Sequence, residues 1–197
     1  MQWHPVLKSL HWLMAVLLLA MLAMGFTMSR LAHAAATTGD YSVTLLGLSI
    51  FDAFQLHKSI GVLLFALLVA RGVIRFATKA PHHAHLKPIE RRAAALVHLG
   101  LYCLMLTMPI TGWLLASSSP LGIPTIVFGL FSLPHPIHPS TGAEMLFGWL
   151  HFLGGCALGA LAAMHIAAAL KHHFVDRDDV LTSMLPALLR LRERRKP

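Results

Sequence analysis

The chain has 197 residues, of which 56% are hydrophobic and 12% are charged, with a mean hydropathy of +0.67. A soluble domain carries about a quarter charged residues, so this composition argues against a soluble enzyme, a disordered segment and a nucleic-acid-binding module. The formal net charge of +8 therefore needs another explanation. We expect an integral membrane protein.

Four stretches are apolar enough to cross a bilayer, which takes about 20 residues. They cover residues 10–31, 53–76, 93–117 and 147–170. We therefore expect one domain over residues 1–197, an all-α membrane protein built as a bundle of four transmembrane helices. Ala32-His33-Ala34 resembles a signal-peptidase site, but the apolar run before it is longer than the roughly 7–15 residues of a leader. We expect the first helix to be retained.

Lysine and arginine gather after the second and fourth spans. These segments hold Arg71, Arg75, Lys79, Lys87, Arg91 and Arg92, and then Lys171, Arg177, Arg190, Arg192, Arg194, Arg195 and Lys196. Residues 32–52 and 118–146 hold none. Because basic residues collect on cytoplasmic segments, both termini are expected in the cytoplasm. The basic excess then faces anionic lipid headgroups, and no nucleic-acid partner is needed.

The segment between the third and fourth spans is apolar but contains Pro120, Pro124, Pro134, Pro136 and Pro139. Broken backbone is not tolerated in lipid, so we expect short pieces along the outer surface rather than a fifth span. Residues 180–194 are expected to form a short amphipathic helix at the inner surface, interrupted at Pro186.

Five histidines fall within the spans, namely His11, His57, His98, His151 and His165. An intramembrane histidine is costly unless it is paired or bound. The direction of each span places His57 and His151 near the outer end, and His11 and His165 near the inner end. The 14 positions between His151 and His165 bring them to one helix face, about 21 Å apart. We expect two facing pairs, His57 with His151 and His11 with His165.

Two opposed imidazoles match the axial ligands of a haem, since the porphyrin supplies the other four nitrogens. Zinc usually takes four protein ligands, and the spans offer carboxylates only at their ends. The four paired histidines are therefore predicted to ligate the iron of two haem b groups. Glycines near them favour the flat slot that haem needs: Gly25, Gly61, Gly148, Gly154 and Gly155.

Cationic side chains are expected beside both predicted haems. Arg71 lies 14 residues after His57, which places it on the same face at the inner level, and Arg75 follows one turn later. Lys58 and Arg30 are the candidate cations of the outer level. His98 has two interpretations that stay open, a quinone or propionate contact and a simple interfacial histidine. The histidines outside the spans are mostly expected to be solvated or interfacial, although His172 and His173 are candidates to touch the inner site.

Three segments together resemble the bacterial cytochrome b561 family, over nearly the whole chain. They are Leu10-His11-Trp12-Leu13, the Arg71 and Arg75 pair, and Trp149-Leu150-His151 leading to the run from His165 to His173. The resemblance implies a four-helix dihaem protein of the bacterial inner membrane. By position it implies that His11 and His165 hold the inner haem and that His57 and His151 hold the outer one.

The best understood type of member is a superoxide oxidase, so the resemblance implies that electrons pass from periplasmic superoxide to ubiquinone. Lys58 and Arg30 are then the expected catalytic residues, since positive charge steers an anion. Arg71, Arg75 and His98 are expected to meet the quinone.

Two other functions stay open. The first is an electron-transfer subunit between quinone and a periplasmic dehydrogenase or hydrogenase, with residues 32–52 and 118–145 as docking surface. The second is a non-haem metal transporter that uses the histidine pairs.

Overall fold

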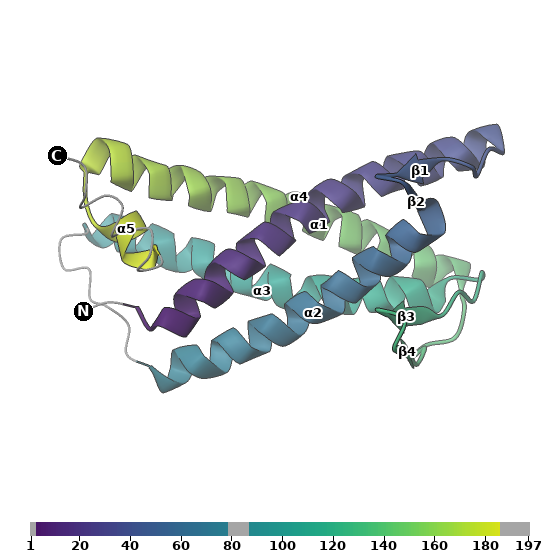
Figure 1. The fold of residues 1–197 in the computed structure, drawn as a ribbon, viewed down its shortest axis with the longest axis horizontal. Coiled ribbons are helices and arrows are strands. Elements are labelled where there is room, and N and C mark those ends of the chain that lie inside the picture. Colours follow the sequence, from purple (N-terminus) through teal and green to yellow (C-terminus); the bar gives the residue numbers. More distant parts are fainter. Residues whose placement is uncertain (1–2, 79–86, 186–197) are drawn as a thin grey trace.

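The computed structural model describes residues 3–78 and 87–185. Four long helices dominate it: α1 Pro5–Thr38, α2 Ile50–Ala77, α3 Pro88–Ser118 and α4 Thr141–Lys171 (Figure 1). A π-helix, η1 (His172–Asp176), and the short helix α5 (Val180–Met184) follow α4. All four long helices are long and apolar enough to cross a membrane, so the predicted number of spanning helices is confirmed.

Each long helix extends beyond its predicted apolar stretch, and capping groups mark several of the helix ends. The Ser49 hydroxyl accepts a hydrogen bond from the Asp52 amide at the start of α2, and the Ser140 hydroxyl accepts one from the Ala143 amide at the start of α4. Gly39 closes α1 in the left-handed conformation, with φ 73°. Side-chain oxygens at the first position and glycine after the last are the usual terminators of helices.

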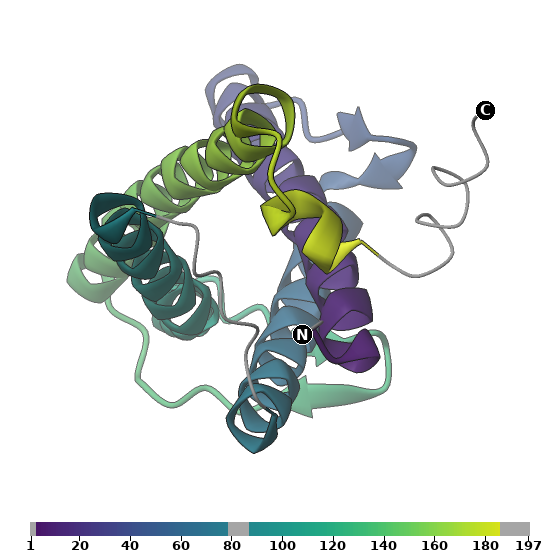
Figure 2. The ribbon, with the colours of Figure 1, turned by 90° about the vertical axis from the view of Figure 1, so that its left-hand side faces the viewer.

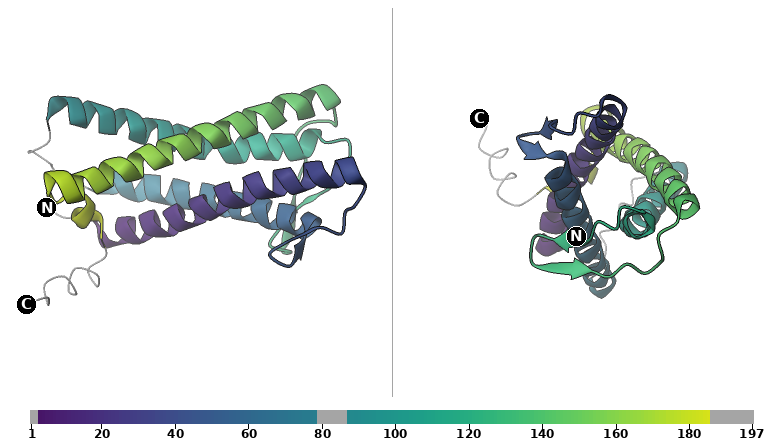
Figure 3. Two further views of the ribbon diagram at one scale, coloured as in Figure 1. Left: turned by 90° about the horizontal axis from the view of Figure 1, so that it is seen from above. Right: turned by 90° about the vertical axis from the view of Figure 1, so that its right-hand side faces the viewer.

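Two short antiparallel hairpins correct the expectation of an entirely α-helical chain. The first pairs β1 (Thr44–Leu45) with β2 (Leu48–Ser49), and the second pairs β3 (Thr125–Val127) with β4 (Phe131–Leu133). In the first hairpin the two turn residues, Leu46 and Gly47, have φ of 53° and 81°, as a tight two-residue turn requires. Both hairpins lie at the end of the bundle opposite α5 (Figures 1 and 3).

The β3–β4 hairpin is fixed to the start of α2, so the segment after α3 folds back on the bundle and forms no fifth span. Gln55 donates to the Pro124 carbonyl at 2.8 Å and accepts from the Ile126 amide at 3.2 Å. The Ser59 hydroxyl, which is 2% exposed, accepts from the Phe128 amide at 2.9 Å. These bonds satisfy one carbonyl and two amides of residues 124–128.

The bundle consists of two closely packed helix pairs, α1 with α2 and α3 with α4, joined mainly through α2 and α3. Figure 2 shows the two pairs on opposite sides of the bundle, with α5 crossing the near end between α4 and α1. The buried apolar cluster of the bundle consists of Met14, Leu64 and Leu68, with Met105 packed against it.

Helix α5 is held against the first turns of α1 at this end. The Trp12 indole donates to the Met184 carbonyl at 3.0 Å, and the Lys8 ammonium donates to the Leu185 carbonyl at 3.4 Å. The start of α1 and the end of the described chain therefore lie on the same side of the bundle. Of the helix expected over residues 180–194, α5 is the described part, and residues 186–194 lie outside the described residues.

Substituting Ser59→Ala tests the hairpin clamp. The change removes the acceptor of the Phe128 amide, a hydrogen bond worth about 0.5–1.5 kcal/mol. We expect amide hydrogen exchange in residues 125–133 to accelerate by about tenfold or more, while exchange in the four long helices stays unchanged.

Ser42→Ala is the matched control, because its hydroxyl bonds only the exposed Asp40 carboxylate. Equal exchange of residues 125–133 in both variants would show that Ser59 does not hold the hairpin.

Candidate functional site

The pair predicted for the outer level consists of His57 from α2 and His151 from α4, and the names outer and inner are kept below for the two predicted levels. Their ring centroids lie 6.2 Å apart and their planes meet at 75°. The two rings therefore oppose each other across the interior, from helices that belong to different packed pairs. The 14-residue spacing within α4 places His165 at the other level of the bundle, about 21 Å along the helix axis.

Two glycines allow the other two helices to approach the rings of the outer pair. A Cβ atom at Gly25 of α1 would lie 3.2 Å from His57 Cε1, and one at Gly112 of α3 would lie 3.0 Å from His151 Cε1. All four long helices thus shape the outer site. Gly112 was not among the glycines that sequence spacing singled out, because its contact with His151 is between helices.

The other four glycines expected near the histidines lie against side chains of neighbouring helices. The nearest side chains to their added Cβ atoms are Met21 for Gly61, Leu115 for Gly148, and Met108 for Gly154 and Gly155. Only Gly25, of the five, contacts a histidine ring.

The inner site brings three histidines together. His11 of α1 and His165 of α4 have ring centroids 6.1 Å apart, with planes at 80°. The ring of His98 from α3 lies 5.2 Å from His165, on which it packs at 63°. His98 therefore belongs to the inner cluster, and the interpretation of it as an isolated interfacial histidine does not fit this contact.

Arg71 is the cation that the structure places beside the inner histidines. Its guanidinium donates to the carbonyl of Leu7, which lies one turn before His11 on α1. Arg75 lies elsewhere: its guanidinium lies 5.2 Å from the Trp3 ring centre and donates to the Thr78 carbonyl at 3.4 Å. Arg71 therefore lies at the inner histidine cluster, whereas Arg75, one helical turn later, lies at the end of α2.

The two cations expected at the outer level differ in their surroundings. The Lys58 ammonium is half-buried and lies 3.4 Å from the Pro124 carbonyl, so it points toward the β3–β4 hairpin. Arg30 is exposed on the outer part of α1. The structure therefore places Lys58 close to the hairpin that covers the start of α2, and Arg30 on the surface.

The two histidine levels are separated by apolar side chains. On α2, Leu64 and Leu68 follow His57 and precede Arg71, and they pack with Met14, which follows His11 by one turn. The site thus consists of two polar levels with an apolar layer between them.

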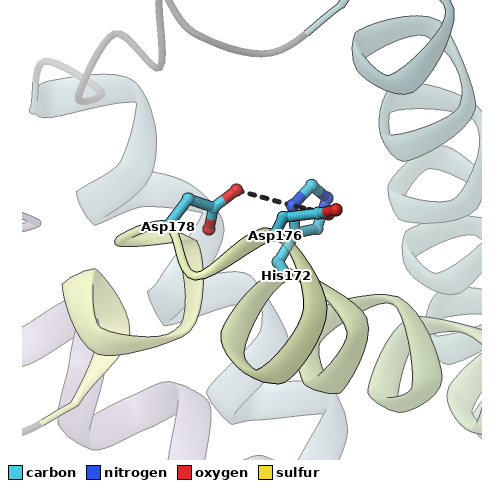
Figure 4. Close-up of side chains that lie close together, drawn as sticks. All are labelled: His172, Asp176 and Asp178. Carbon is cyan, nitrogen blue, oxygen red and sulfur yellow. Dashed lines mark hydrogen bonds and ion pairs between the residues drawn. The ribbon is translucent and has the colours of Figure 1, made fainter.

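His172 does not join the inner histidines but pairs with carboxylates (Figure 4). Its Nδ1 atom lies 2.7 Å from Asp178 Oδ2 and 3.1 Å from Asp176 Oδ2. The Lys171 ammonium also contacts Asp176, at 2.6 Å, and Glu90, at 3.5 Å. The side chains of His172, Asp176 and Asp178 lie close enough together to hold a metal ion. The neighbouring ammonium already balances Asp176, so charge pairing at the end of α4 accounts for this cluster.

Both histidine pairs fit axial ligation of a haem. A metal–nitrogen bond is about 2 Å long, and the centre of an imidazole ring lies roughly 1 Å beyond its ligating nitrogen. Two imidazoles on opposite sides of one metal ion therefore have ring centres about 6 Å apart. The observed 6.2 Å and 6.1 Å agree with this distance. Within the described residues, the buried Nδ1 atom of His57 has no hydrogen-bond partner.

Comparison with known proteins gives a consistent result. The chain matches the family described as prokaryotic cytochrome b561 over residues 2–187. It is 36% identical over 176 residues to cytochrome b561 homolog 2 of Escherichia coli (strain K12), covering 89% of this chain and 86% of that protein. It is 27% identical over 133 residues to cytochrome b561 homolog 1 of the same organism, covering 67% and 74%. The family match includes all four long helices and therefore both histidine pairs.

Substituting Gly112→Ala tests the fit of the outer site. The added methyl group would lie 3.0 Å from His151 Cε1, so the ring must shift. We expect the haem content of the purified protein to fall toward half of the wild-type value, measured from visible absorbance per chain.

Gly72→Ala on α2 is the control, since its Cβ meets nothing within 4 Å. This variant should keep full haem content and gain up to about 1 kcal/mol of helix stability. Full haem content in Gly112→Ala would contradict the close approach of α3 to the ligand.

Proposed function

Because the chain belongs to the prokaryotic cytochrome b561 family, we propose that this membrane electron-transfer protein holds two haem b groups, one at each histidine pair. His57 and His151 would hold the outer haem, and His11 and His165 the inner one. The observation that carries the proposal is the opposition of two imidazoles at each of two levels. When bound, each haem supplies a site that takes up and releases one electron.

The distribution of charge supports an orientation with the α5 end in the cytoplasm. Lysine and arginine favour that side of a membrane. Among the described residues, the α5 end carries Lys8, Arg71, Arg75, Lys87, Arg91, Arg92, Lys171 and Arg177, whereas the hairpin end carries Arg30 and Lys58. The protein is then a multi-pass protein of the bacterial inner membrane, with both termini inside.

The reaction that we propose is the oxidation of superoxide at the outer end, coupled to ubiquinone reduction at the inner end. Two superoxide ions each give up one electron and leave as two O₂ molecules. One ubiquinone takes up these two electrons with two protons and becomes ubiquinol. Lys58 and Arg30 supply the positive charge that raises the encounter rate of the anion with the outer end.

At the inner end, Arg71 and His98 are the residues that we propose to contact the quinone. The Arg71 guanidinium is oriented by its bond to the Leu7 carbonyl and keeps further N–H donors available for a quinone carbonyl or a haem propionate. His98 packs on His165 from the α3 side. Arg75, one turn beyond Arg71, adds positive charge at the rim of this end.

Histidine substitutions distinguish the proposed ligands from His98. We expect His57→Ala and His151→Ala to lose the outer haem and keep the inner one, and His11→Ala and His165→Ala to do the reverse. Each variant should bind about half of the wild-type haem, measured as absorbance of extracted haem per chain.

His98→Ala is the matched control and should keep both haems. If His98→Ala loses one haem while His11→Ala keeps two, His98 rather than His11 is the inner ligand.

Superoxide consumption tests the proposed reaction. Purified protein supplied with enzymatically generated superoxide and a ubiquinone analogue should form one ubiquinol for every two superoxide ions consumed, and His57→Ala should abolish this. Lys58→Gln should lower the rate several-fold at low salt and weaken its salt dependence, because screening acts on the charge that was removed.

Arg92→Gln, an exposed change at the opposite end, should leave the superoxide-dependent rate unaltered. If superoxide fails to reduce the wild-type protein, whereas a periplasmic dehydrogenase or hydrogenase does, the chain is an electron-transfer subunit for that partner. A colourless protein would favour the non-haem metal transporter.

A further inference from the structure

The hydroxyl group of Thr111 lies directly beside one of the proposed outer ligands. We propose that Thr111 is a positioning residue that fixes the tautomer of His151, so that His151 presents an unprotonated Nε2 atom to the outer haem iron. The inference rests on the proposed function, since it assigns a role at the same outer site. Beyond the proposed function, the inference names the group that selects which nitrogen of His151 ligates the iron.

The hydrogen-bond geometry determines the direction of the contact. Thr111 Oγ1 lies 3.0 Å from the Met108 carbonyl oxygen and 3.2 Å from His151 Nδ1. A hydroxyl has one proton to donate, and a carbonyl oxygen can only accept. Thr111 therefore donates to Met108 and accepts from His151, so Nδ1 carries the ring proton. The Met108 carbonyl is itself a second acceptor for the His151 ring, so it favours the protonated nitrogen together with Thr111. The lone pair then resides on Nε2, the nitrogen left free for a metal.

The backbone of α3 keeps the ring of His151 in this orientation. The residue after Thr111 is Gly112, and a Cβ atom there would lie 3.0 Å from His151 Cε1 and 3.3 Å from Nδ1. The ring thus packs directly on the helix that carries the threonine. Thr111 and Gly112 act together: the glycine lets the ring approach, and the hydroxyl group selects which nitrogen bears the proton.

The opposing ligand lacks such a partner. Within the described residues, His57 Nδ1 is buried without a hydrogen bond. A hydrogen bond from the outer nitrogen of a ligating imidazole raises the basicity of the ligand. A more basic ligand stabilises the oxidised iron, so the Thr111 contact should lower the reduction potential of the outer haem relative to a site without it.

The chain offers a matched control one turn earlier on the same helix. Thr107 is exposed, and among the described residues its hydroxyl bonds only carbonyl groups of its own helix, those of Cys103 at 3.0 Å and Leu104 at 3.3 Å. Thr107→Val therefore removes a hydroxyl from α3 without changing a histidine contact.

The test compares Thr111→Val, Thr111→Ser and Thr107→Val in the full-length, haem-loaded protein, by redox titration and low-temperature electron paramagnetic resonance. Thr111→Val should shift the outer haem to a more positive midpoint potential and change its g-values, with the inner haem unchanged. Thr111→Ser should restore the wild-type values, and Thr107→Val should match wild type throughout.

A Thr111→Val protein with wild-type potential and g-values at the outer haem would overturn the inference while leaving the proposed function intact. If Thr111→Val fails to retain the outer haem, recovery of that haem in Thr111→Ser supports the inference, and absence of recovery overturns it. A wild-type protein that binds no haem would instead overturn the proposed function, and this inference with it.

Discussion

The cost of placing an imidazole within apolar helices is the constraint on which the rest of the structure depends. Each of the five histidines predicted within the apolar stretches lies opposite or beside another imidazole: His57 with His151, and His11 and His98 with His165. Such groups are rarely left facing lipid. Because α4 carries one member of each pair at a 14-residue spacing, it determines which faces of α1 and α2 turn inward. The antiparallel bundle is the arrangement that meets this requirement at both levels.

The two ends of the bundle are closed by different means. At the outer end, side chains of α2 bind the backbone of the β3–β4 hairpin through Gln55 and Ser59. At the inner end, the Trp12 side chain binds the backbone of α5. In both cases a side chain on a long helix satisfies a peptide group of a short element, so the short elements need little core of their own. The two ends of the bundle therefore present differently built surfaces.

Apolar length and histidine spacing were enough to predict the four helices and to predict which histidines face each other. Other features depended on contacts between helices, which spacing does not encode. His98 has no partner at helical spacing on α3, so its contact with His165 could not be foreseen. The same holds for Gly112, whose importance arises from the ring of a different helix. The spacing of Arg71 and Arg75 from His57 predicts the same role for both. Their different positions, Arg71 beside the inner histidines and Arg75 at the end of α2, follow from the packing of α1 on α2. The hairpins are too short to show an alternating pattern.

The central claim is that four imidazoles from α1, α2 and α4 ligate two irons. The most direct measurement is the iron and haem content per chain of the wild-type protein, combined with its low-temperature electron paramagnetic resonance spectrum. We expect two haem b per chain, both low-spin with two imidazole ligands. A single haem, a high-spin centre with an open position, or a protein without iron would contradict it.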